Sequence, residues 1–420
     1  MNRRQPIIVM LVVGISMILV LSLIPYSLAR NSIAQLRSMV APGAVVQVSA
    51  PQRTSTEPAF DVAAWYAERG EQPETHGVLI ENLEGTRTFA SHNVDEAFNP
   101  ASLIKLVTSL VALKKLGADY RFKIRVYAAG ETDQTGTLRG RLFVYGSDPT
   151  FGDIGAHLIA DELKSRGIKS VSEALVVSPD FCFNFSESAE ESGARLARAL
   201  NLGKTEVGVS EQVEGRLLFS FNSNTLSEML LYMNARSSNF VAERIGALAG
   251  GPISLRQFLI DQLHLPASEV TIARASGREH NRMTARGVVM VIRALVEETR
   301  RQGLEPTDIM PVASDDAGTL RRRLAGTGLE GAVVGKTGTL TSEVDGGMSS
   351  LGGLVYTHDA GIVLFAILDQ GNRIWDHRQM EDQLLADAIK SQATPLGVAG
   401  PTPRKLLPPS SLKITDENGE

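Results

Sequence analysis

Apolar residues follow two spacings along this chain, and together they predict a mixed α/β protein. Strand-like apolar runs cover 77–83 and 86–90, and the turn-forming pair Glu-Gly between them predicts a hairpin. Similar apolar runs predict further strands, at 120–128, 138–145, 174–177, 333–341, 351–356 and 361–368.

Apolar positions at helical spacing predict a helix over 102–116, which follows Pro100 and stops at Gly117. The same pattern predicts a short helix at 61–69. A further short helix is predicted at 154–166, a mostly helical stretch at 224–249, and helices at 284–299 and 378–393. No internal repeat interrupts this succession of helices and strands.

The first thirty residues contain a hydrophobic segment. Arg3 and Arg4 precede 18 uncharged residues at 7–24, a length that suits a membrane-spanning helix better than the core of a signal peptide. Because basic flanking residues stay in the cytoplasm, the rest of the chain is expected on the periplasmic side, tethered in the cell envelope. The alternative is a signal peptide cleaved after a weak site at 27–29. Both interpretations predict an exported protein.

Composition narrows the function classes. The chain has 42 Lys and Arg against 47 Asp and Glu, so nucleic-acid binding has no electrostatic support. Cys182 is the only cysteine, which excludes an internal disulfide and a thiolate metal cluster. The seven histidines form no HExxH pair, which disfavours a zinc hydrolase.

The first candidate motif is Ser102-Leu103-Ile104-Lys105, at the start of the predicted helix. Spacing i, i+3 places the serine and the lysine on one helix face. A serine hydroxyl is a weak nucleophile until a base removes its proton, and a lysine can be that base when burial or a nearby cation lowers its pKa. The N–H of Ser102, at the helix start, can also help to hold an oxyanion.

The second candidate motif is Ser237-Ser238-Asn239, 135 positions after Ser102 and between helical runs. A hydroxyl and a carboxamide two positions apart can face the same side of a short turn. There they can relay a proton and bind an amide substrate.

The third candidate motif is Lys336-Thr337-Gly338-Thr339, inside the predicted strand 333–341. In a regular strand Lys336 and Gly338 face one side. A cation beside a hydroxyl suits a substrate carboxylate, and glycine lets a ligand or another backbone come close. The backbone N–H just after Gly338 can complete an oxyanion hole.

In chain order these motifs read SxxK, SxN and KTG, the set found in penicillin-binding proteins and class A β-lactamases. Over roughly 77–393 the chain resembles the serine D-Ala-D-Ala carboxypeptidase/endopeptidase family, the class C low-molecular-mass penicillin-binding proteins. The resemblance includes Gly-Ser-Asp-Pro-Thr at 146–150. Two departures are Ser238, where the family usually has Asp, and Arg-Ala-Ser-Gly at 274–277, where Asp-Gly-Ser-Gly is common.

The resemblance implies an α/β fold, a β-lactamase/transpeptidase-like sandwich. A five-stranded antiparallel sheet would be flanked by helices, with a helical region alongside. The resemblance also implies a penicillin-binding/transpeptidase-like domain at 76–394, interrupted by a mainly-β insertion at 120–220. The sequence pattern outside this region predicts a membrane anchor or signal segment at 1–30, a proline-containing spacer at 31–75 and a flexible tail at 395–420, rich in proline and charge. The insertion is shorter than the family leads us to expect.

The resemblance further implies acyl transfer to water. Ser102 would attack the carbonyl of a penultimate D-Ala with Lys105 as the base, so the pKa of Lys105 should be lowered. Ser237 would pass a proton to the departing amine, assisted by Lys336, which is expected to keep its charge. The backbone N–H groups of Ser102 and Thr339 would hold the oxyanion.

Substrate-binding roles are implied for the other motif residues. Asn239 would bind the peptide amide, and Lys336, Thr337 and Thr339 would meet the terminal carboxylate beside Gly338. The implied substrates are peptidoglycan stem peptides, and β-lactam antibiotics would be acylating inhibitors. No metal, organic cofactor or nucleic acid is expected, and the membrane would be a partner only through the N-terminal segment.

Two alternatives remain open at this point. A class A β-lactamase needs a deacylating glutamate in an ExxLN-type segment, which the chain lacks, and a class C enzyme would have Tyr-x-Asn where Ser237 stands. A non-catalytic cell-wall scaffold with the same fold would have no reason to retain every motif residue.

Overall fold

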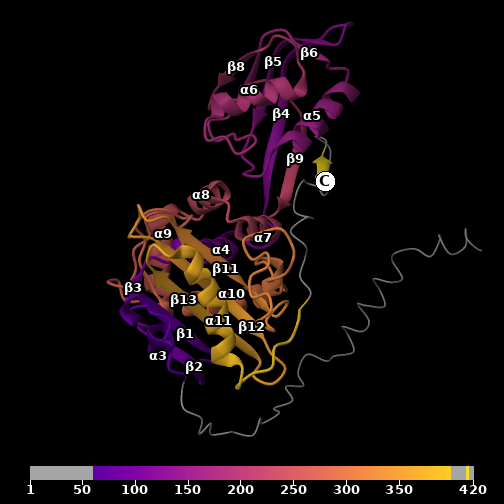
Figure 1. Ribbon diagram of the computed structural model, residues 1–420. Coiled ribbons are helices and arrows are strands. Elements are labelled where there is room, and N and C mark those ends of the chain that lie inside the picture. The colour runs from indigo at the N-terminus through magenta and orange to yellow at the C-terminus, as the bar shows by residue number, and fades with distance from the viewer. Residues whose placement is uncertain (1–59, 399–412, 416–420) are drawn as a thin grey trace, which may run out of the picture. The chain divides into compact units, whose positions relative to one another are not determined.

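The computed structural model describes residues 60–398 and a short strand, β14 (Lys413–Thr415) (Figure 1). The predicted anchor or signal segment at 1–30, the spacer up to residue 59 and most of the predicted tail lie outside these residues. Within the described part, no helix combines the length and the apolar character needed to cross a membrane.

A five-stranded antiparallel sheet lies between two hydrophobic cores of the chain. Its order is β11-β12-β13-β1-β2, so strands from the two ends of the chain are neighbours. The strands are β1 (His76–Asn82), β2 (Thr88–His92), β11 (Val333–Leu340), β12 (Met348–Tyr356) and β13 (Ile362–Gln370). The predicted five-stranded sheet and the predicted hairpin are confirmed.

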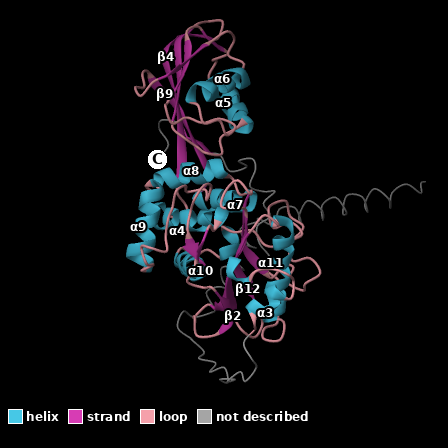
Figure 2. Ribbon diagram, turned by 60° about the vertical axis from the view of Figure 1, so that its left-hand side comes forward, coloured by secondary structure: helices cyan, strands magenta, loops and turns pink. Residues whose placement is uncertain are grey.

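Both faces of this sheet are covered by helices (Figure 2). In β13, Leu364, Ala366 and Leu368 pack toward one core, and Val363, Phe365 and Ile367 pack toward the other, because successive side chains alternate between the faces. This explains the continuous apolar runs in the sequence. The first core includes α4 (Ile104–Leu116) and α10 (Ala285–Arg301), and the second includes α3 (Val62–Ala67) and α11 (Ile374–Ile389).

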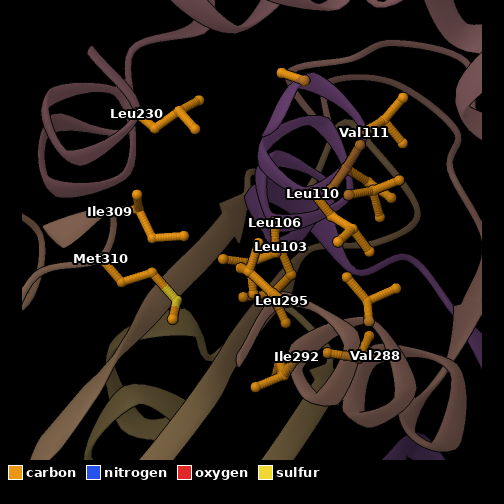
Figure 3. Close-up of a cluster of buried hydrophobic side chains, with 14 of the residues drawn as sticks. Leu103, Leu106, Leu110, Val111, Leu230, Val288, Ile292, Leu295, Ile309 and Met310 are labelled. Atoms are coloured by element: carbon orange, nitrogen blue, oxygen red, sulfur yellow. The ribbon is translucent and has the colours of Figure 1, made fainter. Parts of the chain in front are cut away.

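Packing of α4 on α10 fixes the helix that carries the first motif. Leu106 and Leu110 of α4 lie opposite Val288 and Ile292 of α10, and all four side chains are buried (Figure 3). Burial of one such side chain contributes about 1.5–3 kcal/mol. The helix therefore holds its motif residues in a fixed position.

A helical region lies beside α4. It consists of α7 (Leu226–Arg236), α8 (Asn239–Leu248) and α9 (Gly251–Leu263). The prediction that 224–249 is mostly helical, with the second motif between helical runs, is confirmed: Ser237 has a φ of 53° and ends α7, and Ser238 caps α8. The helix α9 was not predicted, since only Leu255 and Leu259 on it are fully buried and its apolar pattern is weak.

Residues between α4 and α7 form a second sheet with a core of its own, and β14 from the C-terminal part of the chain pairs with its edge strand β9. Its order is β14-β9-β4-β5-β7-β8, with β6 also paired to β5. Two helices pack on it, and α6 was not predicted because small residues such as Ser192 and Gly193 make up much of its buried face. The elements are β4 (Arg121–Thr132), β5 (Thr137–Tyr145), α5 (Asp153–Ser165), β6 (Ser170–Val171), β7 (Ala174–Val177), α6 (Ala189–Leu200), β8 (Glu206–Val209) and β9 (Arg216–Thr225).

The insertion begins and ends at one place. Arg121 at the start of β4 pairs with Thr225 at the end of β9. Just outside the sheet, the Leu226 N–H donates to the Tyr120 carbonyl at 2.8 Å and the Ser227 N–H donates to that of Ala118 at 3.1 Å. The outgoing and returning segments of the chain therefore run side by side.

Short elements complete the described fold. They are the paired strands β3 (Ala97–Phe98) and β10 (Met283–Thr284) and the 3₁₀ turns η1 (Pro73–Thr75), η2 (Ala101–Leu103) and η3 (Pro306–Asp308).

Candidate active site

Ser102 lies in the 3₁₀ turn η2, which runs directly into α4. The preceding residue, Ala101, has a φ of 50°, a left-handed conformation that non-glycine residues rarely adopt. Such strain persists only where the surroundings impose it, and Ala101 is buried with its N–H donating to Asn99 Oδ1 at 3.1 Å. The strained turn presents the half-buried Ser102 side chain at the start of the helix.

Lys105 lies one turn after Ser102 and is fully buried. Its Nζ atom lies 2.9 Å from Ser102 Oγ, 2.8 Å from Asn239 Oδ1 and 2.5 Å from the Ser276 carbonyl oxygen. A neutral amine has two N–H donors and one lone pair. The donors fit the two carbonyl-type oxygens, which leaves the lone pair for the hydroxyl proton of Ser102. This is the geometry of a general base.

The charge state of Lys105 also suits this role. Burial lowers the pKa of Lys105 to about 7, the Glu243 carboxylate acts against burial, and Arg278 acts with it. Near neutral pH a substantial fraction of Lys105 is therefore uncharged, as the sequence predicts for a base.

Lys336 departs from the expectation that it keeps its charge. It lies on β11, is fully buried, and its pKa is held well below the usual range by burial and by the nearby Lys105. None of the described carboxylates lies within ion-pair distance of it to stabilise the charge. Its Nζ atom donates to Ser237 Oγ at 2.9 Å and to the Thr337 carbonyl at 2.6 Å.

The junction between α7 and α8 places the second motif. Ser237, in the left-handed conformation, turns its hydroxyl toward Lys336, and Asn239, the first residue of α8, turns its carboxamide toward Lys105. Ser238 Oγ accepts from the Val241 N–H at 3.3 Å and so caps α8. Serine and aspartate are comparable caps, which explains in physical terms why serine is tolerated at this departure from the family pattern.

The edge of β11 presents backbone groups to the site. The Gly335 N–H points away from β12, because it donates to the Pro311 carbonyl at 3.1 Å. Residues two positions apart in a strand point their backbone groups to the same side, so the N–H groups of Thr337 and Thr339 also face this edge. Thr339 is exposed at this edge, so its backbone N–H, the expected oxyanion donor, lies on the side of β11 that a substrate can reach.

Gly338 lets β11 touch the turn that carries Ser102. A Cβ atom at this position would overlap Ser350 Oγ and lie 2.8 Å from the Pro100 carbonyl oxygen and 2.9 Å from Ala101 Cβ. Ser350 Oγ in turn donates to the Pro100 carbonyl at 3.0 Å. The structure thus brings the three motifs together around Ser102.

The loop between α9 and α10 supplies contacts that the sequence analysis missed. The Ser276 carbonyl accepts from Lys105, and the Ser276 N–H donates to Glu243 Oε1 at 3.0 Å. Gly277 follows with a φ of 83°, and a Cβ atom there would overlap the Ala101 carbonyl oxygen. The only sequence signal was the Ser-Gly pair within the segment 274–277, because contacts made by backbone atoms leave no side-chain signature.

Asp345 ties the β11–β12 loop to the turn of Ser102, another contact that the sequence did not reveal. Its carboxylate accepts from Asn99 Nδ2 at 2.7 Å and from both terminal nitrogens of Arg282 at 2.8 and 3.1 Å. These hydrogen bonds hold the pKa of Asp345 well below its usual range, so it stays ionised. His280 Nδ1 lies 3.1 Å from the same carboxylate.

Within 60–398, no group of three or more His, Cys, Asp or Glu residues is arranged to hold a metal ion. Cys182 is buried in the insertion, where its Sγ atom lies 3.2 Å from the Asp148 carbonyl oxygen, and burial raises the pKa of its thiol to about 11.

The sequence of this chain matches a known protein family and one characterised relative. The sequence profile described as the D-Ala-D-Ala carboxypeptidase 3 (S13) family matches residues 61–184 and 180–391. A D-alanyl-D-alanine carboxypeptidase from Actinomadura sp. (strain R39) is 26% identical over an alignment of 176 residues, and the match covers 38% of this chain and 32% of that protein. The match thus spans about a third of that relative's length.

Solved structures share the fold. The predatory peptidoglycan endopeptidase Bd3459 from Bdellovibrio bacteriovorus has a TM-score of 0.67 and 20% identity, covering 81% of this chain and 98% of that one. Penicillin binding protein 4 from Haemophilus influenzae has a TM-score of 0.59 and 17% identity, covering 74% and 96%. A penicillin G acylated form of Bd3459, in complex with the immunity protein Bd3460, has a TM-score of 0.64 and 21% identity, covering 81% and 99%. The predicted β-lactamase/transpeptidase-like fold is confirmed.

The contact between Gly277 and Ala101 generates a stability test. We expect Gly277→Ala to lower the free energy of unfolding by about 2–5 kcal/mol, because it combines a left-handed alanine with steric overlap in a packed site. Gly361→Ala is the matched control, since Gly361 has a φ of 69° but open space around it. It should cost only about 1–2 kcal/mol. Denaturant unfolding measures both, and equal losses would contradict the proposed close contact.

Proposed function

The chain belongs to the D-Ala-D-Ala carboxypeptidase 3 (S13) family, and we propose that it is a serine D-alanyl-D-alanine carboxypeptidase/endopeptidase acting on peptidoglycan stem peptides. The observation that carries the proposal is the 2.9 Å approach of the buried Lys105 amine to Ser102 Oγ. The names of the similar proteins support it, since one is a D-alanyl-D-alanine carboxypeptidase and another a peptidoglycan endopeptidase.

The first chemical step is acylation of the serine. Ser102 Oγ bonds to the carbonyl carbon of the penultimate D-Ala, and the Lys105 amine takes the hydroxyl proton. The carbonyl oxygen becomes an oxyanion, which in this proposal the backbone N–H groups of Ser102 and Thr339 hold. Asn239 accepts a hydrogen bond from Lys105 and so lies beside the reacting pair, where it would orient the peptide amide.

Departure of the amine needs a proton. The C–N bond to the terminal residue breaks, and Ser237 gives its hydroxyl proton to the leaving nitrogen while Lys336, 2.9 Å away, replenishes it. The proton that Lys105 took from Ser102 then replaces the one that Lys336 gave up, which leaves the Lys105 amine neutral again. Water attacks the acyl carbonyl carbon and gives a proton to Lys105, and as the bond to Ser102 Oγ breaks, Lys105 returns that proton to the serine. A crosslink in which the leaving nitrogen belongs to a diamino acid is cut by the same steps.

The substrate's terminal carboxylate gives Lys336 a negatively charged partner, which the free enzyme does not provide within ion-pair distance among its described residues. A carboxylate placed at the open edge of β11, beside Thr337 and Thr339, favours the ammonium form of Lys336 and so raises its pKa. The lysine therefore gains a proton when such a substrate binds, and that proton is available for the leaving amine. Recognition and proton supply are coupled through one side chain.

We further propose that the protein is exported and tethered to the membrane by the uncharged segment at 7–24. Peptidoglycan lies outside the cytoplasmic membrane, so export places the enzyme with its substrate. Arg3 and Arg4 would stay on the cytoplasmic side.

Acylation by benzylpenicillin tests the proposed function directly. A β-lactam carbonyl mimics the scissile bond, so intact-mass analysis should find one adduct, mapped by digestion to the peptide containing Ser102. Ser102→Ala should give none. An adduct elsewhere, or none on the wild type, would refute the assignment, and rapid turnover of the β-lactam would indicate a β-lactamase instead.

Substitution by arginine distinguishes the two lysines. Arginine cannot give up its proton at working pH, so Lys105→Arg should slow acylation by penicillin and by peptide by about 100-fold or more. Lys336→Arg still offers a cation to the terminal carboxylate but cannot pass a proton to Ser237, so it should retain only part of the activity.

A substrate comparison completes this test. Amidation of the peptide's terminal carboxylate should slow acylation of the wild type much more than that of Lys336→Ala, because only the wild type has the partner cation. Near-normal acylation of Lys105→Arg would contradict the base assignment. Equal sensitivity of the wild type and Lys336→Ala to amidation would contradict the carboxylate assignment.

The membrane proposal has its own test. If the segment is an uncleaved anchor, the mature protein should begin at the extreme N-terminus, and it should stay with the membrane in high salt but not in detergent. N-terminal sequencing that starts near residue 30 would show a cleaved signal peptide instead.

A further inference from the structure

Glu243, on α8, is part of the site but belongs to none of the three motifs. We propose that Glu243 is a positioning residue that holds the Ser276 carbonyl against Lys105 and sets the electrostatic field at its amine; this role rests on the proposed function. Asn239 and Glu243 are spaced i, i+4 and so share one face of α8.

The geometry links Glu243 to the base through one residue. Glu243 Oε1 accepts from the Ser276 N–H at 3.0 Å, and the Ser276 carbonyl accepts from Lys105 Nζ at 2.5 Å. The same carbonyl oxygen lies 3.5 Å from Ser102 Oγ. The backbone of Ser276 thus connects the carboxylate on one side to the serine and lysine pair on the other.

Two of the three contacts of the Lys105 amine depend on α8. Asn239 supplies one directly at 2.8 Å, and Glu243 fixes the other by holding Ser276. Ser276 is fully buried, so without Glu243 its N–H would lose a partner in a place that water does not reach. The carbonyl would then be free to move away from the amine.

Among the charged groups that act on Lys105, Glu243 is the carboxylate. Arg278, from the same loop as Ser276, and Lys336, from β11, are cationic groups whose charges interact with that of Lys105, and Arg274 of that loop interacts with Glu243 itself. Burial lowers the pKa of Lys105, and the Glu243 carboxylate acts in the opposite direction. Removal of this charge alone should therefore lower the pKa further, so that the base is free of its proton at lower pH.

Acylation by a fluorescent penicillin, measured as a function of pH, tests the proposal. The wild-type rate should rise with pH through about 7, as Lys105 loses its proton. In Glu243→Gln the amide oxygen can still accept from Ser276 but the charge is gone, so the rise should move to lower pH by about half a unit or more. In Glu243→Ala the high-pH rate should also fall, by about 10- to 100-fold, because the carbonyl is no longer held.

Glu279→Gln is the matched control. Its carboxylate is exposed and pairs with Arg274 at 2.9 Å, near Glu243 but without a bond to Ser276. This variant should reproduce the wild-type pH profile and rate. Thermal unfolding of each variant checks that it is folded.

The outcomes separate the two hypotheses. If the wild type is not acylated at all, the proposed function fails. If the wild type is acylated but Glu243→Gln rises at the same pH, or Glu279→Gln shifts equally, the role of Glu243 is refuted. If Glu243→Ala keeps the full high-pH rate, the positioning of the Ser276 carbonyl is refuted.

Discussion

Two lysine amines are removed from water in this site, and none of the described carboxylates lies within ion-pair distance of either. An ammonium ion is costly to bury without a partner, so the fold must supply the free energy that keeps Lys105 and Lys336 in place. The two cores on either face of the five-stranded sheet provide it, because they fix α4 and β11, which carry the two lysines. The free-energy cost of burying an ammonium ion also explains the chemistry. Because burial disfavours the charged form, the amine is partly unprotonated near neutral pH and can act as a base.

This constraint explains why the surroundings are close-packed and strained. Ala101 adopts a left-handed conformation, Ser237 does the same, and Gly277 and Gly338 allow backbone contacts that a side chain would prevent. Each of these features costs free energy locally. Together they bring one hydroxyl to each amine while water is kept from the lysine side chains.

Much of this arrangement could be predicted from the sequence, and the limits have physical causes. The strands of the central sheet follow from continuous apolar runs, and Ser102, Lys105 and Lys336 follow from their motifs. Ser276 could not be assigned a role in advance because it acts through its backbone. Glu243 and Asp345 were missed since neither belongs to a motif, and each meets the site only after distant segments are folded together. The helix α9 could not be predicted, because a helix with few buried positions shows little periodicity of apolar residues.

The paired ends of the insertion have a consequence for how such chains vary. Arg121 and Thr225 are partners across neighbouring strands, so the segment between them closes on itself before α7 begins. The loop-closure entropy changes slowly with the length of such a segment, by about 0.6 kcal/mol for each doubling. Mutations that shorten or lengthen the insertion can therefore accumulate without moving Ser237 relative to Lys105. In evolutionary terms the separation of 135 positions between the first two motifs is free to drift, whereas the atoms that those motifs bring together are not.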